Sequence, residues 1–153
     1  HRNFQGYCTL ETTGQVYAFG ASSISQLESA YIQNIKNASQ YINAIEKDKL
    51  AVFRGYSVNK QQKIVREIIN SIMCNYFVDF NLISSKYKMS ISEIFEFINF
   101  NTDSLDDFIS DKILVFKENK ISINKSGRLF TRNIAMRFDP LIDKKVGTYS
   151  NTV

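Results

Sequence analysis

The residues that could do chemistry begin with the opening heptapeptide, His1-Arg2-Asn3-Phe4-Gln5-Gly6-Tyr7. It combines an imidazole, a guanidinium, two amides and two aromatic rings, and it shows no helix or strand periodicity. Gly6 lets the backbone approach a ligand closely, because glycine has no Cβ. We expect these residues to form one wall of a ligand site. Because a chain terminus is an unusual place for a dense recognition motif, we also expect the chain to begin within a larger protein.

A second candidate site lies at Phe19-Gly20-Ala21-Ser22-Ser23-Ile24-Ser25, where small residues follow the short apolar run at 16–19. This pattern predicts a strand that turns into a helix capped by Ser25. The N-terminus of a helix presents unpaired N–H groups and a partial positive charge, which suits a carboxylate or an adenine edge. The alternative is a plain strand-to-helix turn, which small residues also favour.

The composition excludes several kinds of self-contained active site. His1 is the only histidine, so a catalytic triad or a zinc deaminase site has no internal imidazole to use. No phosphate-binding GxxxxGK[ST] or GxGxxG pattern occurs. Helical spacing scatters the acidic residues of segment 103–111 around the axis, so they are better interpreted as a solvated face than as a metal site. These acids are Asp103, Asp106, Asp107 and Asp111.

Length and composition indicate a folded domain. The 153 residues are 44% hydrophobic and 13% aromatic, enough for a real core. The net charge of +4 is too small to indicate nucleic-acid binding by itself, although it fits an anionic ligand. No apolar run approaches the ~18 residues of a membrane span, and no signal peptide opens the chain. Cys8 and Cys74 form no CxxC pair, so we expect a cytoplasmic protein with reduced cysteines.

The elements expected to position these residues are mainly helices. Apolar residues at helical spacing predict one long amphipathic helix over about 25–47, followed by a connector over 48–60. The clearest helix has an apolar face that runs from Ile64 to Phe77. Ser90 and Glu93 match a capping box before the next helix.

The last third of the chain completes the predicted fold. Thr102 or Asp103 can cap a third helix, and alternating apolar residues around 118–120 predict a hairpin. A final helix is expected over about 126–139, where Pro140 stops it. The fold class is therefore mainly α with a small β-hairpin, and the order of elements over 61–142 is a winged-helix pattern.

A winged helix raises the question of nucleic-acid binding, because the helix before the wing often enters the major groove. Here that helix carries the four carboxylates of segment 103–111, which would repel phosphate. We therefore expect no nucleic-acid partner.

Short motifs follow one another in order along the whole chain. Besides the heptapeptide and segment 19–25, they are Phe53-Arg54-Gly55, Ile72-Met73-Cys74-Asn75, Ser126-Gly127-Arg128-Leu129-Phe130-Thr131-Arg132-Asn133-Ile134, Phe138-Asp139 and Tyr149-Ser150. Together they resemble the oxygen-independent coproporphyrinogen III oxidases, and the heptapeptide is the most specific of them.

The resemblance implies a radical S-adenosylmethionine enzyme of bacterial haem synthesis. Such enzymes oxidatively decarboxylate two propionates of coproporphyrinogen III to give protoporphyrinogen IX. A CxxxCxxC motif in a partial barrel holds their 4Fe-4S cluster, which cleaves S-adenosylmethionine to a radical. That motif is absent here, so the cluster is expected upstream of this chain.

The resemblance also implies a domain organisation and a set of partners. Residues 1–25 would be the remnant strand and end of the radical S-adenosylmethionine barrel, and residues 26–60 a long helix and connector. Residues 61–153 would be a winged-helix-like lid domain. The expected partners are coproporphyrinogen III and the upstream barrel of the same polypeptide, and the chain alone is expected to be inactive.

Individual roles follow from the same resemblance. The Gln5 side chain and the Ile24 backbone match positions that bind S-adenosylmethionine, and Arg2 lies beside them. Three arginines are candidates to face the propionates, because a guanidinium fits a carboxylate in bidentate fashion. These are Arg54, Arg128 and Arg132; surface ion pairing is the alternative for each.

Two residues depart from the pattern of the resembled enzymes. Ala18 stands where they usually have a glycine, and its methyl group would crowd a ligand. Asn151 replaces an arginine of their tail, which puts the handling of substrate in doubt. A haem-chaperone type of relative and a non-enzymatic winged-helix binding module remain the alternative functions.

Overall fold

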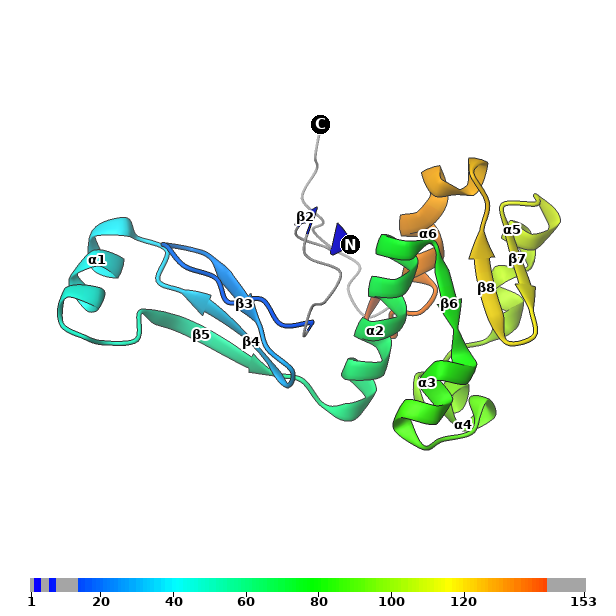
Figure 1. The fold of residues 1–153 in the computed structure, drawn as a ribbon, viewed down its shortest axis with the longest axis horizontal. Helices are drawn as coiled ribbons and strands as arrows, with labels where there is room; N and C mark the ends of the chain where they lie inside the picture. Colours follow the sequence, from blue (N-terminus) through cyan, green and yellow to red (C-terminus); the bar gives the residue numbers. More distant parts are fainter. Residues whose placement is uncertain (1, 4–5, 8–13, 143–153) are drawn as a thin grey trace. The chain divides into compact units, whose positions relative to one another are not determined.

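The computed structural model describes residues 2–3, 6–7 and 14–142, and it divides the chain into two compact units. One unit comprises residues 9–63 and is called the sheet unit here. The other comprises residues 1–8 and 64–153 and is called the helical unit. Figure 1 shows the elements of both units in chain order.

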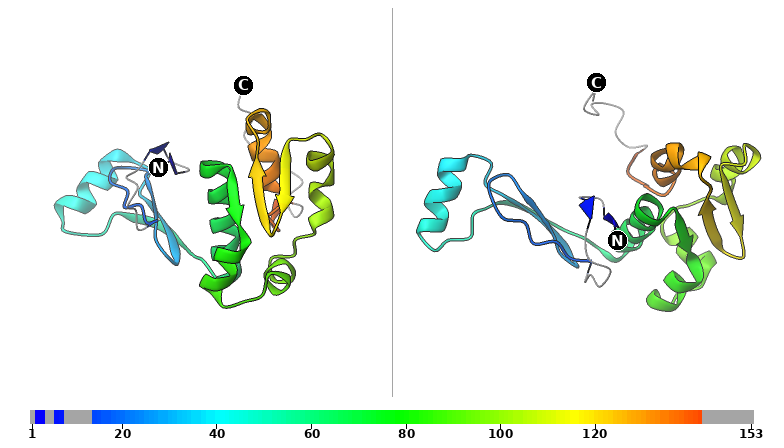
Figure 2. Two further views of the ribbon diagram at one scale, coloured as in Figure 1. Left: turned by 45° about the vertical axis from the view of Figure 1, so that its right-hand side comes forward. Right: turned by 45° about the horizontal axis from the view of Figure 1, so that its top comes forward.

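The sheet unit is built on a three-stranded antiparallel sheet. Its strands are β3 (Ile24–Gln26), β4 (Ala30–Asn34) and β5 (Val52–Ser57), in the order β3-β4-β5. The views of Figures 1 and 2 agree that the three strands lie side by side. A short turn joins β3 to β4, where the Leu27 N–H donates to the Ala30 carbonyl at 2.8 Å. An irregularity at Gln33/Asn34 shifts the register between β4 and β5.

The prediction of one long helix over 25–47 is wrong for its first half. Residues 24–26 and 30–34 are strands, and the helix α1 covers only Ala38–Glu46. Apolar residues spaced four apart in 27–35 suited a helix, but cross-strand pairing with β5 extends this segment instead. Asn37 begins α1, because its side chain accepts from the Gln40 N–H at 3.0 Å. Ser25 is therefore a strand residue and not a helix cap.

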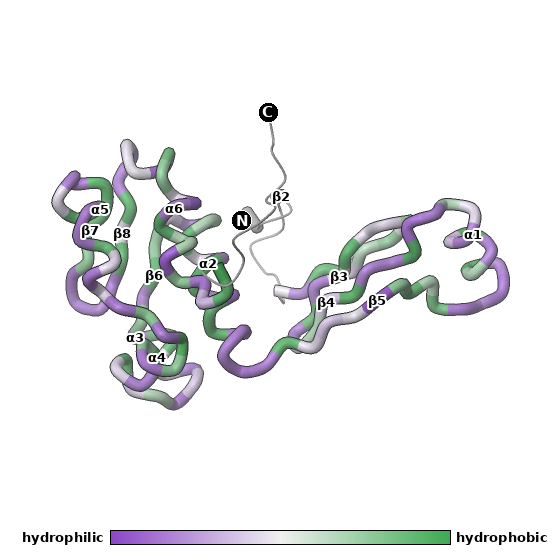
Figure 3. Tube along the Cα trace, turned by 180° about the vertical axis from the view of Figure 1, so that it is seen from behind, coloured by the Kyte–Doolittle hydropathy of each residue, from purple (hydrophilic) through white to green (hydrophobic). Residues whose placement is uncertain are grey.

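The sheet unit buries little of itself. Of its described residues, only Ala51 and Val58 are buried. Phe19 is 87% exposed and Leu50 is 90% exposed. Hydrophobic and hydrophilic residues are interleaved along β3, β4 and β5 in Figure 3. An unburied sheet of this size is marginal in isolation, since three strands need an apolar layer to pack against.

The helical unit contains the remaining helices and a second sheet. Its helices are α2 (Lys60–Asn75, whose first turn lies in the sheet unit), α3 (Phe80–Tyr87), α4 (Ile91–Phe97), α5 (Asp106–Ser110) and α6 (Thr131–Met136), with 3-10 turns η1 (Thr102–Leu105) and η2 (Ser126–Phe130). Its sheet has β6 (Phe77–Asp79), β7 (Leu114–Lys117) and β8 (Lys120–Ile123) in the antiparallel order β6-β8-β7. A separate pair, β1 (Arg2–Asn3) and β2 (Gly6–Tyr7), is also antiparallel.

The predicted hairpin is confirmed as β7 and β8. Glu118 and Asn119 join the strands, and both have positive φ, as a two-residue turn of the tight hairpin type requires. The third strand, β6, was not predicted. Tyr76 has a φ of 59°, which ends α2 before Phe77, and Phe77 then pairs with Ser122.

The helix ends follow local capping. The capping box of α4 is confirmed, with Ser90 accepting from the Glu93 N–H and Glu93 accepting from the Ser90 N–H. Asn101, and not Thr102 or Asp103, caps the next turn by accepting from the Asp103 N–H at 3.0 Å. The final helix predicted over 126–139 is divided into η2 and α6.

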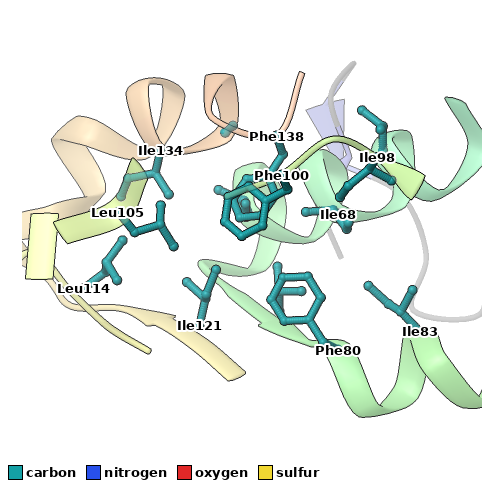
Figure 4. Packing of buried hydrophobic residues seen from close by; sticks show 14 of the residues in the cluster. Ile68, Phe80, Ile83, Ile98, Phe100, Leu105, Leu114, Ile121, Ile134 and Phe138 are labelled. Atoms are coloured by element: carbon teal, nitrogen blue, oxygen red, sulfur yellow. The ribbon is translucent and has the colours of Figure 1, made fainter. Parts of the chain in front are cut away.

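The core of the helical unit is aliphatic with an aromatic centre. Figure 4 shows residues from its helices and sheet converging there, among them Ile68, Leu114 and Ile134. The rings of Phe100 and Phe138 are stacked with their centroids 4.2 Å apart. The Phe80 and Phe95 rings meet edge-on at 4.9 Å, a favourable aromatic geometry. No helix within the described residues is both long enough and apolar enough to cross a membrane.

Candidate functional site

A pocket of about 270 Å³ lies on one face of the β3-β4-β5 sheet. The register places Ile24 opposite Gln33 and Gln33 opposite Arg54, so these three side chains form one row across the strands. Tyr31 and Tyr56 are opposite each other in the next row of the same face. The pocket is lined by Ile24, Tyr31, Gln33, Arg54, Gly55 and Tyr56.

Arg54 supplies the positive charge of this pocket. Its Nε–H donates to the Gln33 Oε1 at 2.9 Å, and its guanidinium carbon lies 6.0 Å from the centroid of the Phe53 ring. No carboxylate among the described residues forms an ion pair with it. A guanidinium has five N–H donors, so Arg54 can bind a carboxylate in bidentate fashion while one donor stays on Gln33.

Gln33 connects the pocket with the turn that precedes β3. Its Nε2 donates to the Ser22 carbonyl at 3.2 Å, while its Oε1 accepts from Arg54. The Ser22 N–H in turn donates to the Ile35 carbonyl at 2.9 Å. Ser22 has a φ of 63°, in the left-handed region of backbone conformation that residues other than glycine and asparagine rarely adopt.

The turn at 20–23 does not open into a helix, which corrects the prediction of a helix N-terminus there. It leads into β3, and its polar groups bond within the sheet unit. The Gly20 N–H donates to the Tyr41 hydroxyl at 3.0 Å, and the Asn34 Nδ2 donates to the Gly20 carbonyl at 3.0 Å. These bonds make the turn a structural support for the pocket, in place of the predicted anion site.

Two of the predicted site residues are brought together by the sheet. Ile24 and Arg54 come from motifs 30 positions apart in the sequence, and both line the pocket. Ile24 is 42% exposed, so it is accessible there. Arg2 lies in β1, and Gln5 lies outside the described residues.

The other two arginines belong to the helical unit. The Arg128 guanidinium carbon lies 4.5 Å from the centroid of the Tyr76 ring, a cation–π geometry. Arg132 is exposed on α6. Neither residue is therefore a lining residue of the sheet pocket.

Sequence reasoning missed the other side chains that line the pocket. Gln33, Tyr31 and Tyr56 carry no motif, and only the register of β4 against its neighbours shows that they share a face. The segment 30–34, Ala-Tyr-Ile-Gln-Asn, has no alternation of apolar and polar residues that could have indicated a strand.

Carboxylates and thiols do not gather in the part of the chain that the structure describes. No group of three or more His, Cys, Asp and Glu side chains there could hold a metal ion. The acidic residues 103, 106, 107 and 111 are all exposed, as expected of a solvated face.

Comparison with known proteins finds relatives that are named coproporphyrinogen III oxidases. The chain is 31% identical over 145 residues to the oxygen-independent coproporphyrinogen III oxidase of Salmonella typhimurium, covering 95% of this chain and 31% of that relative. It is 29% identical over 154 residues to the enzyme of the same name from Thermostichus vulcanus, of which it covers 46%. No protein-family model matches the chain.

A solved structure shares the fold. The coproporphyrinogen III oxidase of Escherichia coli, described as a radical S-adenosylmethionine enzyme, superposes with a TM-score of 0.78 at 30% identity. The match covers 93% of this chain and 32% of that structure. The chain thus spans about a third of the length of the Salmonella and Escherichia proteins that it matches.

Proposed function

Because the chain is homologous to the oxygen-independent coproporphyrinogen III oxidases, we propose that it supplies the C-terminal part of such an enzyme. The whole protein would oxidatively decarboxylate two propionates of coproporphyrinogen III to form protoporphyrinogen IX. This chain would contribute binding groups, and it would be inactive alone.

The sheet pocket is the observation that carries this proposal. Ile24 and Arg54 were assigned to cofactor and substrate from separate motifs, and they line one cavity. A guanidinium beside two tyrosines and an isoleucine suits a ligand with a carboxylate attached to a largely apolar body. Coproporphyrinogen III has this character, since its propionates extend from a pyrrole macrocycle.

The roles proposed for single residues rest on the pocket for Arg54 and on the resemblance of the motifs for the others. Arg54 binds a propionate through the donors that Gln33 does not occupy. The Ile24 backbone, the Gln5 side chain and Arg2 contribute to the S-adenosylmethionine site. Arg128 and Arg132 remain substrate candidates, although stacking over Tyr76 gives Arg128 a packing role as well.

The cofactor assignment divides between this chain and the rest of the protein. S-adenosylmethionine would offer the pocket a carboxylate for Arg54 and an adenine base for the tyrosine rings, beside the ammonium and sulfonium charges of its methionine part. A 4Fe-4S cluster needs at least three thiolates, and the whole sequence has two cysteines. The cluster, which supplies the electron for radical formation, would therefore be held by the upstream barrel.

The exposure of the sheet unit supports a covering partner within the same polypeptide. Its large apolar side chains include Phe19 and Leu50, both almost fully exposed. Large apolar side chains exposed in a unit with almost no core of its own favour burial against a partner. Residues up to 25 would be the end of the barrel, and the segment 26–60 would connect it to the next domain.

The helical unit would be the lid of the enzyme and of winged-helix type. Its strand order β6-β8-β7, with helices between β6 and β7 and a hairpin from β7 to β8, supports this topology. The exposed acids before the hairpin favour a role other than nucleic-acid binding. The names of the relatives do not favour the haem-chaperone alternative.

A binding titration tests the assignment of Arg54. The stable porphyrin coproporphyrin III is titrated with the chain, and porphyrin fluorescence anisotropy reports binding. Arg54→Gln should weaken binding by about tenfold, the size of a lost charge-assisted hydrogen bond. Lys36→Gln is the control, because Lys36 carries the same charge in the same unit, 5.7 Å from the Phe53 ring, without lining the pocket. Equal affinities of Arg54→Gln and the unchanged chain for coproporphyrin III would contradict the assignment of Arg54 to a propionate.

A further inference from the structure

We propose that Gln33 is a positioning residue that holds the Arg54 guanidinium in the orientation needed to bind a ligand carboxylate. The inference rests on the proposed function and names a residue that no motif singles out. Gln33 is the cross-strand partner of Arg54, and the two side chains share the pocket face of the sheet.

The two hydrogen bonds of Gln33 account for this role. An amide side chain has one acceptor oxygen and one donor nitrogen, and Gln33 uses both. Its Oε1 accepts from the Arg54 Nε–H at 2.9 Å, and its Nε2 donates to the Ser22 carbonyl at 3.2 Å. The bond to Ser22 fixes the amide orientation, so the oxygen must face Arg54.

The backbone under this arrangement is itself constrained. The Ser22 N–H donates to Ile35, and the neighbouring Ser23 carbonyl accepts from the Asn34 N–H, both at 2.9 Å. The Ser23 hydroxyl donates to the Gly20 carbonyl at 2.7 Å. The Ser22 carbonyl that anchors Gln33 therefore lies between two backbone hydrogen bonds. One joins the turn to Asn34, the last residue of β4, and the other joins it to Ile35, the next residue.

A fixed Nε is useful for carboxylate binding. Arginine has a long side chain that loses rotamer freedom when it is held in one place. A guanidinium that is oriented before the ligand arrives has already lost part of that freedom, so the ligand bond is stronger. The predicted gain in binding affinity applies only to ligands that carry a carboxylate.

The test compares coproporphyrin III with its tetraamide, which keeps the macrocycle and removes the negative charges. Gln33→Leu should weaken binding of the tetracarboxylate by about tenfold, as for one hydrogen bond to a charged group, and leave the tetraamide unchanged. Gln26→Leu is the matched control. Gln26 lies on the same face of β3, and its Nε2 donates to the Gly14 carbonyl instead of contacting Arg54.

Two outcomes would overturn the proposal. Gln33→Leu could bind both the tetracarboxylate and S-adenosylmethionine, the two carboxylate ligands, as the unchanged chain does, or it could lose affinity for both porphyrins equally, which would make Gln33 merely structural. If instead Arg54→Gln has no effect on the tetracarboxylate, the proposed function of the pocket fails first. A loss with Arg54→Gln but none with Gln33→Leu rejects the positioning role alone.

The same variants titrated with S-adenosylmethionine identify the source of the carboxylate. A loss confined to the porphyrin assigns Arg54 to a propionate, and a loss confined to S-adenosylmethionine assigns it to the cofactor. Either result supports positioning by Gln33, and no loss in either titration contradicts it.

A measurement on the unchanged chain covers the case in which Gln33→Leu does not fold. The Nε–H signals of arginines can be followed by NMR during exchange into D₂O. The Arg54 signal should exchange about tenfold more slowly than that of the exposed Arg132, whose side chain forms no hydrogen bond with a described residue. Equal exchange rates would show that the bond to Gln33 does not persist.

Discussion

The Arg54 Nε–H donates to the Gln33 Oε1 at 2.9 Å, and this bond joins neighbouring strands on the pocket face of the sheet. No other hydrogen bond of the Arg54 side chain to a described residue accompanies it. The bond leaves the remaining donors of the guanidinium for a ligand. An arginine that is supported at Nε and has donors to spare is suited to a carboxylate.

The geometry of the guanidinium fork can be separated from its charge by Arg54→Lys. Lysine keeps the positive charge but cannot make a bidentate contact. We expect its affinity for coproporphyrin III to lie between those of the unchanged chain and Arg54→Gln, with a loss of about threefold to fivefold. An anisotropy titration measures this, and an affinity equal to that of Arg54→Gln would show that charge contributes nothing.

Gly127 should tolerate no side chain. A Cβ at this position would lie 2.2 Å from the Ile113 carbonyl oxygen and 2.8 Å from Ile123 Cγ2. Gly127→Ala must therefore shift the backbone, and we expect a loss of about 1–3 kcal/mol in the free energy of unfolding. Urea unfolding followed by circular dichroism checks this.

The neighbouring Ser126→Ala is the control for Gly127→Ala. It removes an exposed hydrogen bond of 2.8 Å to Asn124 and adds no atoms, so its cost should stay below about 1 kcal/mol. Equal midpoints for the two variants would contradict the close approach at Gly127.

The capping box of α4 should contribute measurably to stability. The Ser90 hydroxyl oxygen accepts from the Glu93 N–H at 3.3 Å, and the Glu93 carboxylate accepts from the Ser90 N–H at 2.6 Å. Ser90→Ala removes the first bond and should cost about 1 kcal/mol of unfolding free energy. Ser85→Ala, at an exposed site within α3, should change the midpoint little; an equal loss in both would argue against a cap.

Asp79 should give the helical unit a dependence on acid pH. Desolvation raises the pKa of its carboxyl, but hydrogen bonds from Lys120 and from Asn81 outweigh that effect and hold the pKa below its ordinary value of 3.8. The Lys120 Nζ lies 3.1 Å from the carboxylate. Because the folded pKa is the lower one, this stabilisation is present above pH ~4 and is lost as the pH falls through the folded pKa.

Unfolding measured at neutral pH and at about pH 3 tests this dependence. Asp79→Asn should be destabilised at neutral pH, and it should lose less stability than the unchanged chain on acidification. Asp111→Asn serves as control, since Asp111 is exposed and forms no ion pair with a described residue. Parallel pH curves for Asp79→Asn and the unchanged chain would contradict the role of this ion pair.

Local signals in the sequence predicted the parts of the fold that depend on local contacts. The apolar face of α2, the Ser90 capping box and the β7–β8 hairpin all involve residues close in sequence. The β3–β4 hairpin is also local, but it was missed because apolar residues spaced four apart suited a helix. The strand β6 was missed because its pairing is non-local. Phe77, for example, joins β8 across 45 positions, and its apolar side chain also fitted the preceding helix.

The site was predictable only in separate pieces. The motifs that contain Ile24 and Arg54 suggested two roles, but nothing in the sequence indicated that β4 lies between them. Gln33 could be recognised as a neighbour of Arg54 only from the register of β4 against β5. The prediction of a helix N-terminus before residue 25 was wrong because the turn at 20–23 is followed by a strand, which pairs across the sheet.

Oxidase activity in a whole protein tests the proposed function most directly. This chain replaces the matching third of the Salmonella typhimurium relative, and conversion of coproporphyrinogen III is followed with S-adenosylmethionine and a reductant. We predict that protoporphyrinogen IX forms, that Arg54→Gln lowers kcat/KM by about tenfold or more, and that Lys36→Gln leaves it unchanged. A folded chimera that contains its iron–sulfur cluster and forms no product, or one in which Arg54→Gln is fully active, would contradict the account.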